Sequence, residues 1–180
     1  MLALTLIRPW SCALARGPKP IENRSWSPPL SALGQLVAFH GGKKWDEDAA
    51  HDMIAPCLPN GESQPRALWP EAPRTSDESP MGVVGVGRLI GVYRGGTRFD
   101  VADAYSPGAV ARYIRVSEVF AAGRAWYVGG DAYGWIFDER RALKTPVPCR
   151  GAQGLWQLPG DVEAAVRKQL FAESIAGLAP

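Results

Sequence analysis

The sequence predicts an α+β fold built mainly from β-strands, in a single domain of 180 residues. Apolar residues make up 46% of the chain, which is normal for one globular core. Sixteen prolines, twenty glycines and seven tryptophans indicate a loop-rich chain that is mostly β. The apolar segments are also short, and several show the alternating or β-branched pattern of strands.

The first 45 residues are expected to form a strand, a helix and two further strands. Residues 2–7 alternate leucine with other side chains, which suits a short buried strand. Pro9 fits the first turn of a helix, because its missing N–H costs nothing there, and Gly17 is a suitable end. Strands are then expected over residues 21–26 and 35–40. The inner face of the helix would consist of Trp10, Ala13 and Leu14.

The middle of the chain differs in composition. Asp46 can cap a short helix whose inner side would contain Ala49, Ala50, Met53 and Ile54. Residues 56–80 contain six prolines and little periodic apolar pattern, so they predict a long loop or an insertion without the apolar content to nucleate a core. This insertion is a candidate docking segment for a protein partner.

The second half returns to β character. Residues 81–93 predict a strand in which Gly85, Gly87 and Gly91 mark bulges and bends, since no helix follows them as a dinucleotide site requires. Residues 115–121 fit either a strand or a short helix. Short aromatic strands are expected over 133–138 and 155–158, and a terminal helix over 161–172.

Several classes of protein are disfavoured by the composition. No apolar run approaches the ~18 residues of a membrane span, and residues 2–7 are too short for a signal peptide, so no membrane association and a cytoplasmic location are expected. Cys12, Cys57 and Cys149 are scattered, which argues against a disulfide framework and a zinc site. With only two histidines, no metal is expected, and no motif calls for a cofactor.

Charge is unevenly distributed along the chain. Residues 1–45 carry six Lys or Arg and one Glu, a net charge of +5, whereas residues 46–80 carry eight acids and two arginines, a net charge of −6. The remaining residues carry +3. A basic surface would favour binding to a phosphodiester backbone, while ordinary solvated surface charge explains the same numbers.

The segment Gly17–Trp26 has the form Gly-x-Lys-x-x-Glu-x-Arg, with an aromatic residue two positions later. In an extended strand, Glu22, Arg24 and Trp26 would share one face, because side chains alternate along a strand. An acceptor, a planar donor and a stacking ring would then lie side by side, which predicts a recognition surface.

This segment resembles the signature of the ASCH domain, a small β-barrel related to the PUA RNA-binding domains. The preceding Leu-Ile-Arg-Pro-Trp run at 6–10, the Val-Ala-Phe-His-Gly-Gly-Lys run at 37–43, Tyr-Gly-Trp at 133–135 and the run 148–156 resemble other parts of the family. The resemblance implies a PUA-like β-barrel with flanking helices over residues 1–160, with an insertion at 56–80. The C-terminal helix and tail, 161–180, would pack on the same domain.

The resemblance also implies the function. ASCH and PUA-like proteins bind RNA or other nucleic acids, some are reported as ribonucleases, and some use a Lys/Thr/Glu set to hydrolyse the amide of acetylcytidine. Lys19 matches that lysine, but Glu22 stands where those enzymes have threonine, and no residue clearly matches their distal glutamate. The implied function is binding of RNA or a modified nucleotide. The alternatives are a hydrolase of RNA or an N-acylated nucleoside with Lys19 as base or nucleophile, and a protein-interaction module.

The candidate catalytic residues, if the protein is an enzyme, are Lys19 and Glu22. Burial and Arg24 would lower the pKa of Lys19, as a base needs, whereas Glu22 would raise it and keep the lysine cationic for binding. A structural salt-bridge network is the third reading. The candidate ligand-binding residues are Pro9, Trp10, Lys19, Glu22, Asn23, Arg24, Trp26, His40, Gly41, Lys43, Tyr133 and Trp135.

Two groups among these candidates have open alternatives. Trp10, Trp26 and Trp135 could stack on nucleic-acid bases or belong to the core. The run from His40 to Lys43 is expected at a strand end, where Gly41 and the next glycine would either hold an anion or form a hairpin turn with a hydrogen-bonded histidine.

Overall fold

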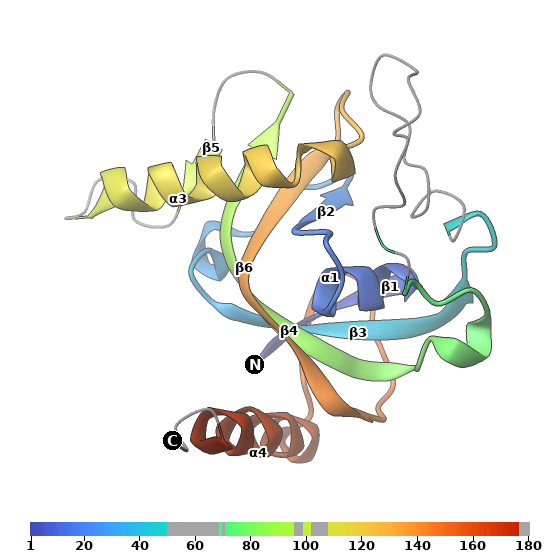
Figure 1. Cartoon of the computed structure of the whole chain (residues 1–180). Coiled ribbons are helices and arrows are strands. Elements are labelled where there is room, and N and C mark those ends of the chain that lie inside the picture. Colours follow the sequence, from blue (N-terminus) through green and yellow to red (C-terminus); the bar gives the residue numbers. More distant parts are fainter. Residues whose placement is uncertain (50–68, 70, 96–98, 102–107, 177–180) are drawn as a thin grey trace.

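The computed structural model describes residues 1–49, 69, 71–95, 99–101 and 108–176 and confirms a mainly β, α+β fold (Figure 1). The strands are β1 (Leu2–Arg8), β2 (Ile21–Arg24), β3 (Leu36–Trp45), β4 (Gly82–Arg94), β5 (Phe99–Val101), β6 (Tyr133–Val147) and β7 (Leu155–Gln157). The helices are α1 (Trp10–Ala15), α3 (Ala109–Ala122) and α4 (Gly160–Ala176), and 3-10 turns lie at Leu30–Ala32, Ser76–Glu78 and Arg124–Trp126.

The strands form one curled sheet in the order β2-β6-β4-β3-β1-β7, with β5 added on β4. Strands β1 and β3 are parallel, and the other pairs are antiparallel. The pairing of β4 with β6 shifts register three times, so the predicted bulged strand over Gly85–Gly91 is confirmed. A Cβ on Gly85 would lie 2.6 Å from the Ala15 Cβ, so this glycine lets the sheet approach α1 closely.

Helix α1 lies on the inside of the curl, against β1, β3, β4 and β6, whereas α3 and α4 lie at opposite ends of the sheet (Figure 1). Leu14 and Ala15 bury their side chains with Leu4, Phe39 and others in the central cluster. The predicted helix after Pro9 is thus confirmed, with Pro9 immediately before its first residue. Because α1 ends at Ala15, the chain turns through Gly17–Pro20 and enters β2, which sets the position of the candidate site.

The other predicted elements are confirmed, extended or outside the described residues. Residues 115–121 are helical, inside α3, and the predicted terminal helix is confirmed as α4, which packs Val162 and Val166 against the sheet. The strand expected at 35–40 continues to Trp45, so a turn at Gly41 is wrong. Of the helix expected after Asp46, Ala49 is described and buried in a core cluster, while the predicted residues from 50 onward and most of the 56–80 segment lie outside the described residues.

The described end of the 56–80 segment is packed into the protein. Trp69 and Ala72 are 7% and 6% exposed and share a cluster with Ala13 of α1. The guanidinium of Arg8 donates to the carbonyls of Ser76 and Ser79, at 2.9 Å and 2.5 Å. The described end of this segment thus packs on the core through a few aromatic and small residues, while the expectation that the segment cannot nucleate a core stays a prediction.

Among the helices in the described part of the chain, none is long and apolar enough to cross a membrane.

Candidate functional site

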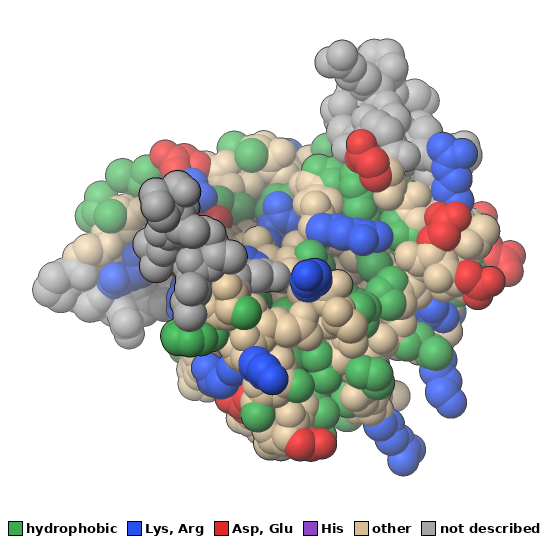
Figure 2. Space-filling view, turned by 60° about the horizontal axis from the view of Figure 1, so that its bottom comes forward, with side chains coloured by type: hydrophobic (Ala, Val, Ile, Leu, Met, Phe, Trp, Pro, Cys, Tyr) green, Lys and Arg blue, Asp and Glu red, His purple; other side chains and the backbone are tan. Residues whose placement is uncertain are grey.

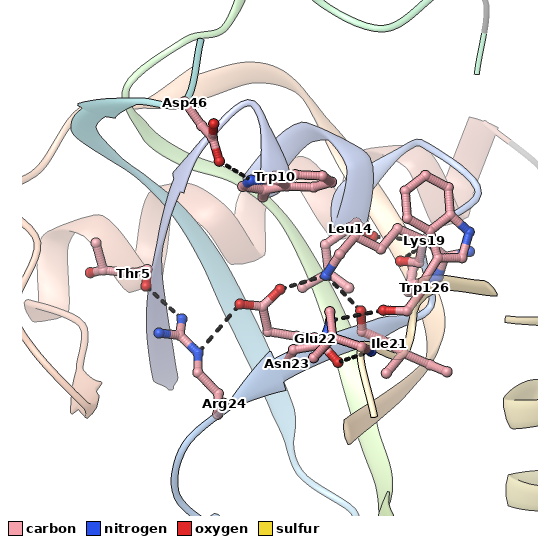
Figure 3. Close-up of polar contacts among 12 residues, drawn as sticks. Thr5, Trp10, Leu14, Lys19, Ile21, Glu22, Asn23, Arg24, Asp46 and Trp126 are labelled. Carbon is pink, nitrogen blue, oxygen red and sulfur yellow. Dashed lines mark hydrogen bonds and ion pairs between the residues drawn. The ribbon is translucent and has the colours of Figure 1, made fainter. Parts of the chain in front are cut away.

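The loop after α1 and the start of β2 bring Lys19, Glu22 and Arg24 into one cluster (Figure 3). Lys19 is 4% exposed, and its Nζ donates to Oε2 of Glu22 and to the carbonyl of Ile21, both at 2.6 Å. Nε of Arg24 lies 3.3 Å from Oε1 of Glu22, and Nη2 of Arg24 donates to the Thr5 carbonyl at 2.7 Å. One carboxylate therefore bridges two cations, and the cluster has a net charge of +1.

The pairing of β2 with β6 explains this arrangement. The strands are antiparallel, with Glu22 opposite Trp135 and Arg24 opposite Tyr133. Alternation puts Glu22 and Arg24 on one face, as predicted, and Asn23 on the other, whereas β2 ends at Arg24, so Trp26 lies beyond the strand that was expected to include it. Asn23 donates to the Trp126 carbonyl at 2.7 Å and accepts from the Val128 N–H at 3.3 Å, so its amide fixes the 3-10 turn at Arg124–Trp126 and the residues after it rather than the cluster.

Trp10 is the aromatic side chain that lies at the cluster. The ammonium of Lys19 is 5.8 Å from the centroid of the Trp10 ring, within range of a cation–π contact. The indole Nε1 donates to Oδ2 of Asp46 at 2.9 Å, which fixes the orientation of the ring (Figure 3). Trp10 is partly exposed, so part of its surface is accessible to a ligand.

Burial lowers the pKa of Lys19 below its ordinary value of 10.5. The charge and hydrogen bond of Glu22 oppose this shift, while the positive charges of Arg24 and Arg140 add to it. Nε of Arg24 is buried near Glu22 without a hydrogen bond of good geometry among the described residues. The cluster thus combines an amine with a weakened proton affinity, a carboxylate and an incompletely satisfied guanidinium, which are groups suited to proton transfer or to polar ligand recognition.

Trp135 does not act as a stacking surface. It is completely buried, its ring packs edge-on against Trp26 at 4.6 Å, and its Nε1 donates to the Trp26 carbonyl. The prediction was wrong for Trp135 because its neighbours in the core come from distant parts of the chain. Tyr133 is partly buried, with the Arg94 guanidinium 4.8 Å above its ring and donating to its hydroxyl.

Three other predicted residues lie away from the cluster or lack exposed groups. Pro9 is buried, and its carbonyl accepts from Cys12 and Ala13. Gly41 is buried within β3, where a Cβ would lie 2.6 Å from the Pro80 carbonyl, so it holds no anion in a turn. Lys43 is exposed at the far end of β3, and the backbone carbonyl of Lys43 accepts from Arg8.

His40 is buried on the side of β3 that faces the C-terminal segment. Its Nε2 lies 3.2 Å from the Cys149 carbonyl, its ring contacts Trp156 edge-on, and its Nδ1 has no partner among the described residues. A Cβ on Gly151 would lie 2.5 Å from the ring, so the histidine is tightly packed. It therefore fits the alternative reading of a hydrogen-bonded histidine, without the hairpin turn.

We expect His40 to make stability fall in acid. Burial lowers its pKa below the ordinary 6.5, so the folded protein binds fewer protons than the unfolded chain. Stability is then fully present above about 6.5 and is lost as the pH falls through the folded pKa. Thermal unfolding at stepped pH should show this loss, and His40→Gln should reduce it. If His51→Gln reduced the loss of stability in acid and His40→Gln left that loss unchanged, the assignment to His40 would be contradicted.

The basic residues of the first 45 positions do not all reach the surface. Of the six basic residues in 1–45, Arg8 and Lys19 are buried and Arg24 is paired, which leaves Arg16, Lys43 and Lys44 exposed. Figure 2 shows Lys and Arg side chains scattered over one face, with the largest group of acidic side chains at the right edge. The sequence could not show this, because net charge per segment contains no information on burial.

Two contributors to the site carried no recognisable sequence signal. Thr5 supplies the carbonyl that holds Arg24, and any residue type could do so. Arg140, from β6, donates to three carbonyls around the Lys19 loop. The described residues contain no group of three or more His, Cys, Asp or Glu side chains that could hold a metal ion.

Of the three comparisons with known proteins, the comparison with solved structures found similar proteins. No family model matches the chain, and no curated protein matches it. The structure is similar to the crystal structure of ASCH from Zymomonas mobilis, with 11% identity over 93% of both chains and a TM-score of 0.45. Two mutants of that protein match with 12% and 13% identity, over 93% of this chain and 96% and 94% of theirs, with TM-scores of 0.44 and 0.43. At these identities no residue role is transferred.

Proposed function

We propose that this protein binds single-stranded RNA, or a modified nucleotide within it, at the cluster formed by Trp10, Lys19, Glu22 and Arg24. The observation that supports the proposal is the assembly of three ionised groups beside a partly exposed indole. The cytoplasmic location and nucleic-acid partner expected from the sequence belong to the same proposal.

The residues have complementary roles in this proposal. Arg24 keeps 23% of its side chain exposed, so the accessible part of its guanidinium can donate to a base edge or a phosphate. The ring of Trp10 can stack on a base, a contact worth roughly 1–3 kcal/mol. Lys19 and Glu22 form the buried polar part of the site. Together with Arg24 they give the cluster a net positive charge.

The test is binding of labelled single-stranded RNA and DNA at stepped salt concentrations. Each phosphate neutralised adds roughly −0.7 to the slope of log affinity against log salt for a single strand. Because few basic side chains of the N-terminal segment are exposed, we expect a shallow slope of about −1 to −2, with base contacts supplying the rest. Arg24→Met should weaken binding about tenfold or more.

Arg167→Met is the matched control, since it removes the same charge on α4, away from the cluster. Equal losses in the two variants, or no binding of either nucleic acid at low salt, would overturn the proposal. If the protein bound RNA and DNA equally well, the proposed site would stand but the preference for RNA would not.

A hydrolase is the second candidate, and one observation favours it. A lysine with a lowered pKa, 2.6 Å from a carboxylate, is a pair that can remove and return a proton. Its substrates would be RNA or an N-acylated nucleoside, with Lys19 as base or nucleophile and Glu22 as its partner.

A further inference from the structure

The side chain of Arg140 reaches from β6 to the backbone that carries Lys19. Its Nη1 donates to the carbonyls of Leu14 at 3.0 Å, Gly17 at 2.8 Å and Lys19 at 3.0 Å. Leu14 is in the last turn of α1, where carbonyls lack intrahelical partners. One guanidinium group therefore closes the end of α1 and holds both sides of the loop that leads into the candidate site.

A local irregularity of β6 directs Arg140 to this position. Val86 pairs with Arg141 and Arg88 pairs with Asp138, so Glu139 and Arg140 on β6 face the single residue Gly87 on β4. This is a β-bulge, which redirects a side chain. Among the described residues, Glu139 is the only non-glycine with a positive φ, at 47°, a conformation that costs energy for residues with a Cβ.

The opposite strand leaves room for the redirected side chain. A Cβ on Gly87 would lie 3.2 Å from Cγ of Arg140 and 2.6 Å from the ring of Phe39. The bulge, the strained Glu139 and the glycine opposite therefore all favour one placement of Arg140. Strain that is retained in this way is a reason to look for function at the group it positions.

The charge of Arg140 is also directed at the site. It is half-buried, and none of the ion pairs found between described residues includes it. Burial lowers the pKa of Arg140, while the charge of Asp138 opposes this shift. The lowered pKa of Lys19 comes mainly from burial, and the positive charge of Arg140 adds a smaller contribution. The backbone contacts and the electrostatic influence act on the same residue.

We propose that Arg140 is a positioning residue that fixes the Gly17–Lys19 loop and so holds the Lys19 amine against Glu22. The proposal rests on the proposed function, because it assumes that this amine belongs to the ligand site. The three hydrogen bonds that Arg140 donates to this loop and to the end of α1 all go to backbone carbonyls. Its removal should let the loop move, hydrate the amine and weaken the Lys19–Glu22 contact.

The test uses the full chain with Arg140→Met and Arg140→Lys, and Arg141→Met as the matched control on the same strand. The pKa of Lys19, measured by NMR in the folded protein, should rise towards 10.5 in Arg140→Met, because both burial and a neighbouring positive charge are lost. RNA affinity should fall about tenfold, the effect of disturbing a preorganised site. Arg140→Lys keeps the charge but not the planar fork, so intermediate values of both are expected.

A purely structural role predicts a different result, in which thermal stability falls but the pKa of Lys19 and the RNA affinity stay at wild-type values. That result, or equal changes in Arg141→Met, would overturn the proposal. If Arg140→Met does not fold, wild-type values of both quantities in Arg140→Lys would overturn it equally. If the wild-type protein binds no RNA, the proposed function fails, while the pKa of Lys19 still tests the positioning role.

Discussion

Glu22→Ala is expected to destabilise the fold by about 3–5 kcal/mol at neutral pH, the usual cost of leaving one member of a buried ion pair without its partner. Lys19 is 4% exposed and would keep only the Ile21 carbonyl as a strong acceptor. Arg24 would lose its carboxylate at the same time. Urea unfolding of the variant and the wild type measures the difference.

The pH dependence of this variant provides a second measurement. Without Glu22, the influence that raises the pKa of Lys19 is gone, so the folded pKa falls further below the ordinary 10.5. The unfolded chain then binds more protons than the folded protein, and the stability of the variant should rise with pH up to about 10.5. A flat profile would show that Lys19 is solvated.

Two comparisons make the interpretation specific. Lys19→Met combined with Glu22→Leu should recover much of the loss, because a buried ion pair can often be replaced by apolar side chains of similar volume. Glu118→Ala removes an exposed carboxylate that pairs with Arg115 on α3, and little change is expected. A loss from Glu22→Ala no larger than that from Glu118→Ala would refute the buried network.

The local part of the site could be predicted from the sequence. Alternation along a strand depends only on neighbouring residues, so the shared face of Glu22 and Arg24 follows directly from their spacing. The same holds for α1, whose start and end are marked by Pro9 and Gly17. The proximity of Lys19 to Glu22, three positions apart at a loop–strand junction, is likewise a local property.

The contributions from distant segments could not be predicted. Whether Trp135 stacks on a ligand or lies in the core depends on Trp26, and whether Trp69 anchors its segment depends on α1. Gly41 lies in a strand because it pairs with Leu6 of β1 and Gly82 of β4, which no local pattern shows. Arg140 reaches the site through a bulge whose position depends on the pairing of β4 with β6.

Lys19→Met is expected to weaken RNA binding by roughly 10-fold to 150-fold, which corresponds to about 1.5–3 kcal/mol for a lost hydrogen bond to a charged group. The reason is that the substitution leaves Glu22 buried with Arg24 as its remaining ion-pair partner and removes one positive charge from the cluster. Lys19→Arg keeps the charge, so it should retain part of the affinity. Titration of labelled RNA with each variant measures both effects, and Lys44→Met, which removes an exposed lysine, is the control.

The same variants separate binding from catalysis. An arginine cannot lose its proton at moderate pH, so a base or nucleophile at Lys19 would be inactivated by Lys19→Arg as fully as by Lys19→Met, typically by at least ~100-fold. We expect the wild-type protein to bind RNA without turnover, because the buried amine is already engaged in hydrogen bonds to the Ile21 carbonyl and to Glu22. Release of cytidine from acetylcytidine, or cleavage of RNA, with activity lost in Lys19→Arg while RNA still binds, would instead establish the hydrolase. If both variants bound RNA as tightly as the wild type, and the wild type showed no turnover, Lys19 would have only a structural role in an ion pair.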